Sequence, residues 1–313
     1  MNTRRRISTA ALAGACGLGL IALSGCSAAT TGGSGGKLRV TASFYPMEFL
    51  ARQIGGDHVE VSNLTKPGVE PHDLELSPKQ TGQLGESGAI VYLKGLQPAV
   101  DEAVAQSGVK NIADAAAMTT LEKHGDEVDG HDHGHAAGGA DADPHIWLDP
   151  VKYAEVARGV NATLAKADPA HEADFRKNTD ALVKKLDGLN ADFEKGLKNR
   201  ASDTFLTTHA AFGYLAERYG LTEEAINGLD PESEPSAHRI KNLHTVAEKH
   251  QVSTVFFETL ANPATAKALA GDLHLKTDVL DPLEGITDAS RGKDYFGVMR
   301  ANLAALQKAL GTK

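Results

Sequence analysis

The feature that most constrains the fold is a long helical stripe with strands and helices alternating on both sides of it. Apolar residues recur at helical spacing between residues 168 and 199, where Phe175, Leu182 and Leu189 mark one face. Asp168 is a suitable N-cap and Pro169 a suitable first helical residue. This predicts a helix of 32 residues, about 48 Å long at 1.5 Å per residue. One small lobe does not need a helix of that length, so we expect it to bridge two lobes.

Short apolar runs alternate with helical stretches before and after this helix. Strands are predicted at 38–44, 59–64, 89–93, 204–208, 252–257 and 276–280. Helices are predicted at 46–54, 78–86, 98–107, 210–219, 236–250, 264–273 and 295–310. This alternation is typical of α/β lobes with parallel sheets flanked by helices.

The chain of 313 residues is long enough for two such lobes. We expect an N-terminal lobe over 38–165, a linking helix over 166–200 and a C-terminal lobe over 201–313. A loop at 123–143 belongs to the N-terminal lobe.

The first 37 residues have the character of an export and anchoring segment. Arginines at 4–6 precede an apolar stretch from about 10 to 23, which suits a secretory signal better than a spanning helix. Leu-Ser-Gly-Cys at 23–26 resembles a bacterial lipobox, so we expect signal peptide 1–25 to be removed and Cys26 to carry lipid. An uncleaved anchor is the alternative, and the arginines match a twin-arginine signal only weakly. Residues 26–37 follow as a flexible tether rich in Gly and Ser.

The cysteine count and the charge narrow the range of partners. Cysteine occurs only at Cys16 and Cys26, so the mature chain would have no thiol for a disulfide or for metal ligation. Removing residues 1–25 takes away three positive charges and changes the formal net charge from −9 to −12. An acidic surface argues against nucleic acid as a partner and is compatible with attraction of cations.

Residues 123–143 interrupt the alternation of strands and helices. They are rich in His, Asp and Gly and hold almost no large apolar side chain. Such a segment cannot repay the entropy of its own ordering, so we expect a mobile loop. Two interpretations stay open, weak metal binding and a solvated insertion with no role in transport. The candidate weak ligands are His124, His131, His133 and His135.

Four residues along the chain are candidates for a single metal shell: His72, His145, His209 and Asp281. His209 and Asp281 each directly follow a predicted strand, and His72 lies in the loop that leaves one. In open α/β sheets, ligands bind beyond the carboxyl ends of the strands. Three imidazoles and one carboxylate form a closed tetrahedral shell suited to zinc. We therefore expect one Zn²⁺ in a cleft between the lobes, with affinity that falls as the histidines protonate.

Each of these residues also has an ordinary structural interpretation. A single histidine after a strand is more often a hydrogen-bonded structural residue, and Asp281 before Pro282 could begin a turn. Glu258, at the end of a predicted strand, is the main rival for the fourth position, and water is a further possibility. Asp149 before Pro150 is better explained as the N-cap of a following helix.

Several segments, in this order, resemble the metal-specific solute-binding lipoproteins of bacterial ABC importers, the ZnuA/TroA group. They are residues 67–75 (PGVEPHDLE), 143–150 (DPHIWLDP), 207–212 (TTHAAF), 234–237 (EPSA), 257–258 (FE), 262–263 (NP) and 280–284 (LDPLE). The resemblance covers about residues 38–312. It implies two lobes bridged by one long rigid helix, with the metal in the interlobe cleft. Carried over by position, His72 and His145 are ligands from the N-terminal lobe, and His209 and Asp281 are ligands from the C-terminal lobe.

The resemblance also implies a function. Manganese binders of this family tend to carry Glu where this chain has His209, so the chain resembles the zinc-uptake subgroup. A loop rich in His is likewise common in zinc importers. The expected protein is an extracytoplasmic lipoprotein of the cell membrane, a monomer and not an enzyme. It would capture Zn²⁺ and deliver it to an ABC permease and its ATPase.

Three other functions compete with this one. A manganese- or iron-binding importer subunit of the same fold is disfavoured by His209. A secreted zinc hydrolase would need an open coordination position and a general base, for which Glu258 is the only candidate. An adhesin, a label sometimes attached to this family, is not supported as the primary role by the sequence.

Overall fold

The structure, a computed structural model, describes residues 36–125, 142–260 and 263–312. Its first half contains a parallel sheet with the strand order β2-β1-β3-β4. The strands are β1 (Leu38–Ala42), β2 (Val59–Asn63), β3 (Ala89–Tyr92) and β4 (Ile112–Asp114). The helices are α1 (Tyr45–Gly55), α2 (Pro78–Gly85), α3 (Pro98–Gln106) and α4 (Pro150–Ala167). The central strand β3 is buried at every residue, as its continuous apolar sequence predicts.

The second half contains another parallel sheet, with the strand order β6-β5-β7-β8. The strands are β5 (Thr204–Thr207), β6 (Thr222–Ala225), β7 (Thr254–Phe257) and β8 (Lys276–Val279). The helices are α6 (Gly213–Tyr219), α7 (Ala237–Lys249), α8 (Ala264–Asp272) and α9 (Tyr295–Leu310). In each lobe the first strand in sequence lies between the second and the third. The lobes therefore share a topology that the sequence does not reveal as a repeat.

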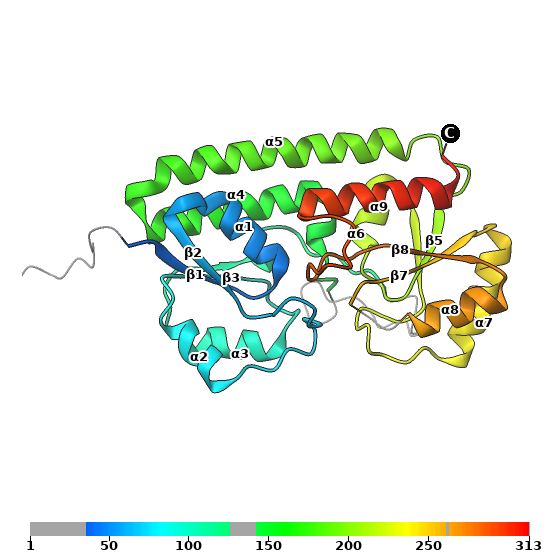
Figure 1. Cartoon of the computed structure of the whole chain (residues 1–313), viewed down its shortest axis with the longest axis horizontal. Helices are drawn as coiled ribbons and strands as arrows, with labels where there is room; N and C mark the ends of the chain where they lie inside the picture. Colours follow the sequence, from blue (N-terminus) through cyan, green and yellow to red (C-terminus); the bar gives the residue numbers. More distant parts are fainter. Residues whose placement is uncertain (1–35, 126–141, 261–262, 313) are drawn as a thin grey trace, which may run out of the picture. The chain divides into compact units, whose positions relative to one another are not determined.

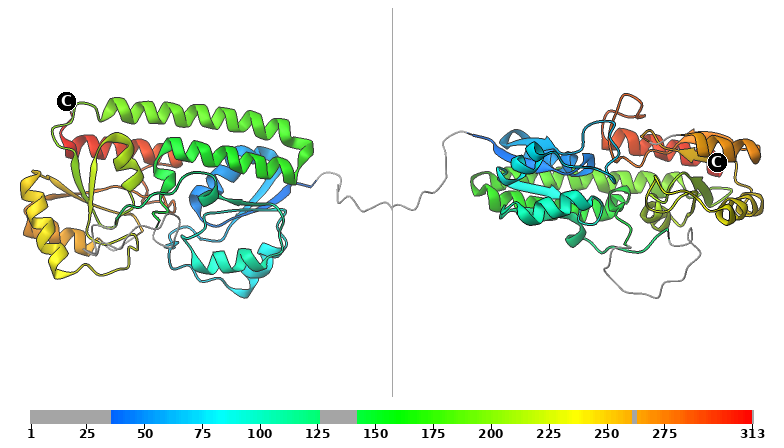
Figure 2. Two further views of the ribbon diagram at one scale, coloured as in Figure 1. Left: turned by 180° about the vertical axis from the view of Figure 1, so that it is seen from behind. Right: turned by 90° about the horizontal axis from the view of Figure 1, so that it is seen from below.

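One long helix, α5 (Glu172–Gly196), links the two lobes. It packs against α1 and α4 of the first lobe and against α9 of the second (Figure 1). The view from behind in Figure 2 shows α5 passing along both α4 and α9. The face of α5 that it buries in these contacts carries Phe175, Thr179, Leu182, Val183, Leu186, Leu189 and Phe193. The predicted architecture of two parallel α/β lobes bridged by one long helix is confirmed.

The bridging helix begins later than predicted. Residues Pro169–His171 form a 3-10 turn, and α5 itself has 25 residues, about 38 Å at 1.5 Å per residue. Asp168 does not cap it, because its carboxylate bonds instead to His171 Nδ1 at 2.6 Å. Asp168 does stand at the N-cap of the 3-10 turn, with Pro169 first in it as predicted, but its side chain makes no capping hydrogen bond.

Two further features complete the comparison with the predicted elements. Asp149 caps α4, since its Oδ1 accepts a hydrogen bond from Val151 N at 2.8 Å, which confirms its predicted role.

Within the described ranges, no helix is both long and apolar enough to cross a membrane. The predicted signal peptide, Cys26 and most of the predicted tether lie outside the described residues. The predicted lobe boundaries at 165 and 200 stay predictions.

Candidate metal site

Four side chains, all from loops at the lobe interface, converge on one point: His72, His145, His209 and Glu284. His72 comes from the loop after β2 and His145 from the segment before α4, whereas His209 follows β5 and Glu284 follows β8. One ligand atom from each lies within 4.8 Å of the others. The side chains of His145, His209 and Glu284 are fully buried and that of His72 is 12% exposed. Each lobe contributes two of the four.

Buried carboxylates orient two of the histidine rings. His145 Nδ1 bonds to Asp143 Oδ1 at 2.8 Å, and His209 Nδ1 bonds to Glu258 Oε1 at 2.5 Å. With Nδ1–H donated to a carboxylate, each ring presents Nε2 to the centre of the cluster. Metal-binding histidines are commonly held in this way, because the second hydrogen bond fixes both the tautomer and the ring direction.

Four of the six distances between ligand atoms in the cluster match the edges of a tetrahedral zinc shell. His72 Nε2 and His145 Nε2 each lie 3.2 Å from Glu284 Oε1, and His209 Nε2 lies 3.5 Å from it. The Nε2 atoms of His145 and His209 are 3.4 Å apart. A tetrahedron with metal–ligand bonds of about 2.0–2.1 Å has edges of about 3.3–3.4 Å. One ion of zinc's size therefore fits at the centre with little movement of the ligands.

The charges around the cluster favour a cation. Burial alone would lower the pKa of His145, but Asp143 and Glu284 raise it to about 9. Burial would raise the pKa of Glu284, yet the three histidines hold it well below its usual range. Among the described residues, the buried oxygens Glu258 Oε2 and Glu284 Oε2 accept no hydrogen bond. Buried carboxylate oxygens without a donor are costly, and a nearby divalent ion would compensate them.

The fourth member of the cluster is Glu284, whereas the sequence pointed to Asp281. The carboxylate of Asp281 is engaged within its own loop, where Oδ1 accepts from Leu283 N at 2.8 Å and Oδ2 from Thr259 Oγ1 at 3.2 Å. Leu283 has a positive φ of 60°, and the turn through it directs the next residue, Glu284, into the cluster. Asp281 thus shapes the loop that presents Glu284.

Sequence reasoning missed two features of this cluster. The segment 280–284 contains two acidic residues, Asp281 and Glu284. The sequence alone does not show which of them faces the cluster, because that depends on the path of the backbone. Glu258, the predicted rival ligand, lies on the far side of the His209 ring and orients that ring. The segment Asp143-Pro-His145 contains the other orienting carboxylate, two residues before the histidine that it holds.

The predicted weak ligands of the loop at 123–143 are only partly described. His131, His133 and His135 lie outside the described residues. His124 is described, and its ring lies against Asp143 and Glu217 rather than in the cluster.

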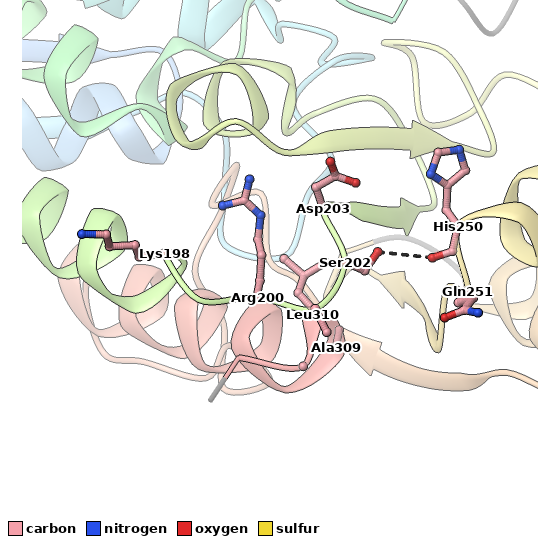
Figure 3. Close-up of a pocket in the computed structure, with 10 residues that line it drawn as sticks. Lys198, Arg200, Ser202, Asp203, His250, Gln251, Ala309 and Leu310 are labelled. Carbon is pink, nitrogen blue, oxygen red and sulfur yellow. Dashed lines mark hydrogen bonds between the residues drawn. The ribbon is translucent and has the colours of Figure 1, made fainter.

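A separate hollow lies where the end of α9 meets the start of β5 (Figure 3). Lys198, Arg200 and Asp203 line it, and Ser202 Oγ donates to the carbonyl oxygen of His250 at its rim. None of the four clustered residues lines this hollow. It is open and polar, and the described residues that line it belong to no group that could hold a metal ion.

The fold and the cluster together indicate a two-lobed metal-binding protein. The family model described as "Zinc-uptake complex component A periplasmic", ZnuA, matches residues 40–309. The chain belongs to this family.

Relatives with curated names and solved structures agree with this assignment. The zinc-binding lipoprotein AdcA of Streptococcus pneumoniae is 35% identical over 95% of this chain and 60% of its own length. The high-affinity zinc uptake system protein ZnuA of Bacillus subtilis is 33% identical over 92% of this chain and 93% of its own length. The Zn(II)-bound ZnuA-like domain of the pneumococcal AdcA superposes with a TM-score of 0.73 at 32% identity, covering 88% of this chain and 99% of that one. The chain spans less than two thirds of the length of the streptococcal relative.

Proposed function

We propose that this chain is the extracytoplasmic zinc-binding subunit of an ABC importer, which captures Zn²⁺ and delivers it to a membrane permease served by an ATPase. The ligands are His72, His145, His209 and Glu284. The observation that carries the proposal is the set of 3.2–3.5 Å separations among these ligand atoms, which fits a zinc tetrahedron. Membership of the zinc-uptake family supports the same cargo.

Binding without catalysis follows from the same shell. Four protein ligands leave no open coordination position where a metal-bound water could be activated. Glu258, the general base that a hydrolase would need, accepts hydrogen bonds at Oε1 from Thr208 Oγ1 and His209 Nδ1, so it lies against the Nδ1 edge of the ring and not at the Nε2 edge that faces the cluster. We therefore propose that the chain is a binding protein and not an enzyme.

The proposal includes a monomeric lipoprotein that begins at Cys26 after removal of residues 1–25. The lipid on Cys26 would hold it at the outer face of the cell membrane, and residues 26–37 would let the lobes reach the permease. Relatives named as lipoproteins support the anchor. The histidines of the loop at 123–143 are proposed as an auxiliary source of weakly held zinc.

Competition between metals tests the zinc assignment. The mature protein is dialysed against equal concentrations of Zn²⁺ and Mn²⁺, and its metal content is measured. We expect one tightly held zinc ion per chain and no stoichiometric manganese. His209→Glu replaces an imidazole with a harder carboxylate and should shift the preference towards manganese. Stoichiometric manganese in the unmodified protein would instead assign the chain to the manganese or iron importers of the same fold.

A further inference from the structure

The loop that presents Glu284 is anchored by hydrogen bonds at successive residues. Asp281 N donates to Asn302 Oδ1 at 3.0 Å, and Asn302 Nδ2 donates back to the carbonyl oxygen of Asp281 at 2.7 Å. Asn302 is buried and lies on α9 of the same lobe. One residue further along the loop, the carbonyl oxygen of Pro282 accepts a hydrogen bond from Trp147 Nε1 at 2.7 Å. Trp147 comes from the N-terminal lobe, so the loop is held from both lobes.

Trp147 is itself held firmly. It is the only tryptophan of the chain, and its side chain is fully buried. Its ring meets that of Phe44 edge-on with centroids 4.9 Å apart, and it lies tilted against the ring of His145 with centroids 5.2 Å apart. It follows His145 by two residues, in the 3-10 turn Ile146–Leu148. An indole enclosed in this way has a fixed direction for its N–H. One side chain therefore contacts the ring of one ligand and anchors the loop that carries another.

This anchor limits how far Glu284 can move away from the histidines. Glu284 Oε1 lies 3.2 Å from Nε2 of both His72 and His145, slightly less than the edge of about 3.3–3.4 Å in a zinc tetrahedron. Because the Glu284 side chain is fully buried, the wider separations that a larger ion needs require movement of its loop. That movement would stretch the bond from Trp147 to Pro282 and leave a buried donor without its acceptor, which is costly.

We infer that Trp147 is a positioning residue for the ion, whose indole N–H fixes the distance from the Glu284 carboxylate to His72 and His145 and thereby favours an ion of zinc's radius. The inference rests on the proposed function and deepens it, because it concerns the same four ligands. The indole offers a hydrogen-bond donor and no lone pair for a metal, so Trp147 acts through the loop and not as a ligand.

Competition between Zn²⁺ and Cd²⁺ tests this role, because Cd²⁺ has the same charge and a filled d shell but a larger radius. The affinity of the mature chain for each ion is measured with chelators that buffer the free metal. Trp147→Phe keeps an aromatic ring beside Phe44 and His145 but removes the N–H. Zinc affinity should fall by about 10-fold or more, as it does when other residues that orient a ligand are changed. Cadmium affinity should fall less, so the ratio of zinc affinity to cadmium affinity should decrease.

A second replacement removes the N–H and keeps the shape of the ring system. Because the chain has one tryptophan, biosynthetic incorporation of benzothienylalanine, in which sulfur replaces the indole N–H, changes Trp147 alone. This protein should show a lower ratio of zinc affinity to cadmium affinity, as Trp147→Phe does. A lower ratio in Trp147→Phe only would assign the effect to the smaller ring and would overturn the inference.

Tyr295→Phe is the matched control. It removes another buried hydrogen bond of 2.7 Å between the lobes, from the Tyr295 hydroxyl to the carbonyl oxygen of Trp147, and does not involve Pro282. This variant should have a lower melting temperature and the affinity ratio of the parent. An unchanged ratio in Trp147→Phe, or an equal decrease in Tyr295→Phe, would contradict a role of the N–H in choosing the ion. Absence of tightly bound zinc from the parent chain would instead contradict the proposed function.

Discussion

At the residue scale, the cluster depends on which acidic side chain of the loop 281–284 reaches the centre. Glu284 lies within 3.5 Å of all three Nε2 atoms, whereas both oxygens of Asp281 accept hydrogen bonds from protein donors. The two residues should therefore respond differently to loss of charge. Under the proposed function Glu284 would bind the ion, whereas Asp281 accepts hydrogen bonds that hold the turn.

Neutral substitutions distinguish these roles. Glu284→Gln removes a charged ligand and should lower zinc affinity by at least about 100-fold, more than the 10- to 100-fold typical of residues that orient a ligand. Asp281→Asn keeps an acceptor for Leu283 N and should lower affinity by less than about 10-fold. Affinity is measured by competition with a chromophoric chelator. Equal losses in both variants would contradict the assignment of Glu284.

A second prediction concerns a titrating carboxyl away from the metal ligands. Glu223 accepts hydrogen bonds from Thr207 Oγ1 at 2.8 Å and from Phe212 N at 3.0 Å. Burial raises its pKa from 4.5 to about 7 despite these bonds. The folded state therefore binds this proton more tightly than the unfolded state. Stability from this group is fully present below pH 4.5 and is lost as the pH rises through about 7.

Glu223→Gln should remove that pH dependence. The amide can donate to Thr207 Oγ1 and accept from Phe212 N, so the local bonds can be kept. Relative to the variant, the parent chain should lose on the order of 2 kcal/mol of unfolding free energy between pH 5 and pH 8. Urea unfolding at the two pH values, with chelator present, measures the difference. If the parent and the variant differed in unfolding free energy by the same amount at pH 5 and at pH 8, the carboxyl of Glu223 would not titrate in this range.

At the scale of elements, the spacing of apolar residues predicted most helices and strands. This works because an element that buries one face carries apolar residues at a regular spacing along the sequence. The predicted helix 295–310 coincides with α9 (Tyr295–Leu310). The strands that escaped prediction are β4, with three residues, and β6, whose sequence TEEA is mostly polar because it lies at the edge of its sheet. An edge position alone does not hide a strand, because the edge strands β2 and β8 were predicted; β4 is too short and β6 too polar to leave a pattern.

The candidate site was less predictable than the elements for a physical reason. From the sequence His209 could be placed at a strand end and His72 in a loop that leaves a strand, but the fourth member of the cluster depends on the backbone turn at Leu283. Local dihedral angles of this kind are set by packing across the lobes, for example by the hydrogen bond from Trp147 Nε1 to the carbonyl oxygen of Pro282 at 2.7 Å. The sequence of the loop alone does not encode that partner.

The bridging helix offers a prediction at this scale. Gly188 lies in the middle of α5, is exposed, and has no atom within 4 Å of the position that a Cβ would take. Gly188→Ala should raise the unfolding free energy by about 0.5–1 kcal/mol, because glycine loses more conformational freedom than alanine in a helix. Denaturant unfolding of parent and variant measures the gain.

Gly196, at the end of the same helix, is the matched control. A Cβ there would lie 2.7 Å from Gln307 Nε2 and 3.1 Å from Leu303 Cδ1. Gly196→Ala should therefore give no comparable gain. If Gly188→Ala were destabilising, α5 would have to bury that position against something else.

At the scale of the whole molecule, the cluster draws two side chains from each lobe, so zinc bound there should raise the stability of the whole fold. An ion that binds only the folded chain adds about 2.7 kcal/mol at a free concentration 100 times its Kd and about 4.1 kcal/mol at 1,000 times. The melting temperature should keep rising with the logarithm of buffered zinc, and chelator should reverse the rise. A melting temperature that is independent of zinc would show that zinc does not bind the folded chain more tightly than the unfolded chain.

The position of α9 has a consequence for how an ion leaves. Helix α9 packs on β5 and β8 of the C-terminal lobe. Tyr295 at its start nevertheless donates to the carbonyl oxygen of Trp147 at 2.7 Å, and its ring lies tilted against that of Tyr153 in the N-terminal lobe, with centroids 4.7 Å apart. Because α9 contacts both lobes, and α5 does so too, neither helix acts as a free hinge between them. The residence time of the ion should then follow the frequency of small local openings in the loops that carry the ligands, and not the rate of a wide swing of one lobe.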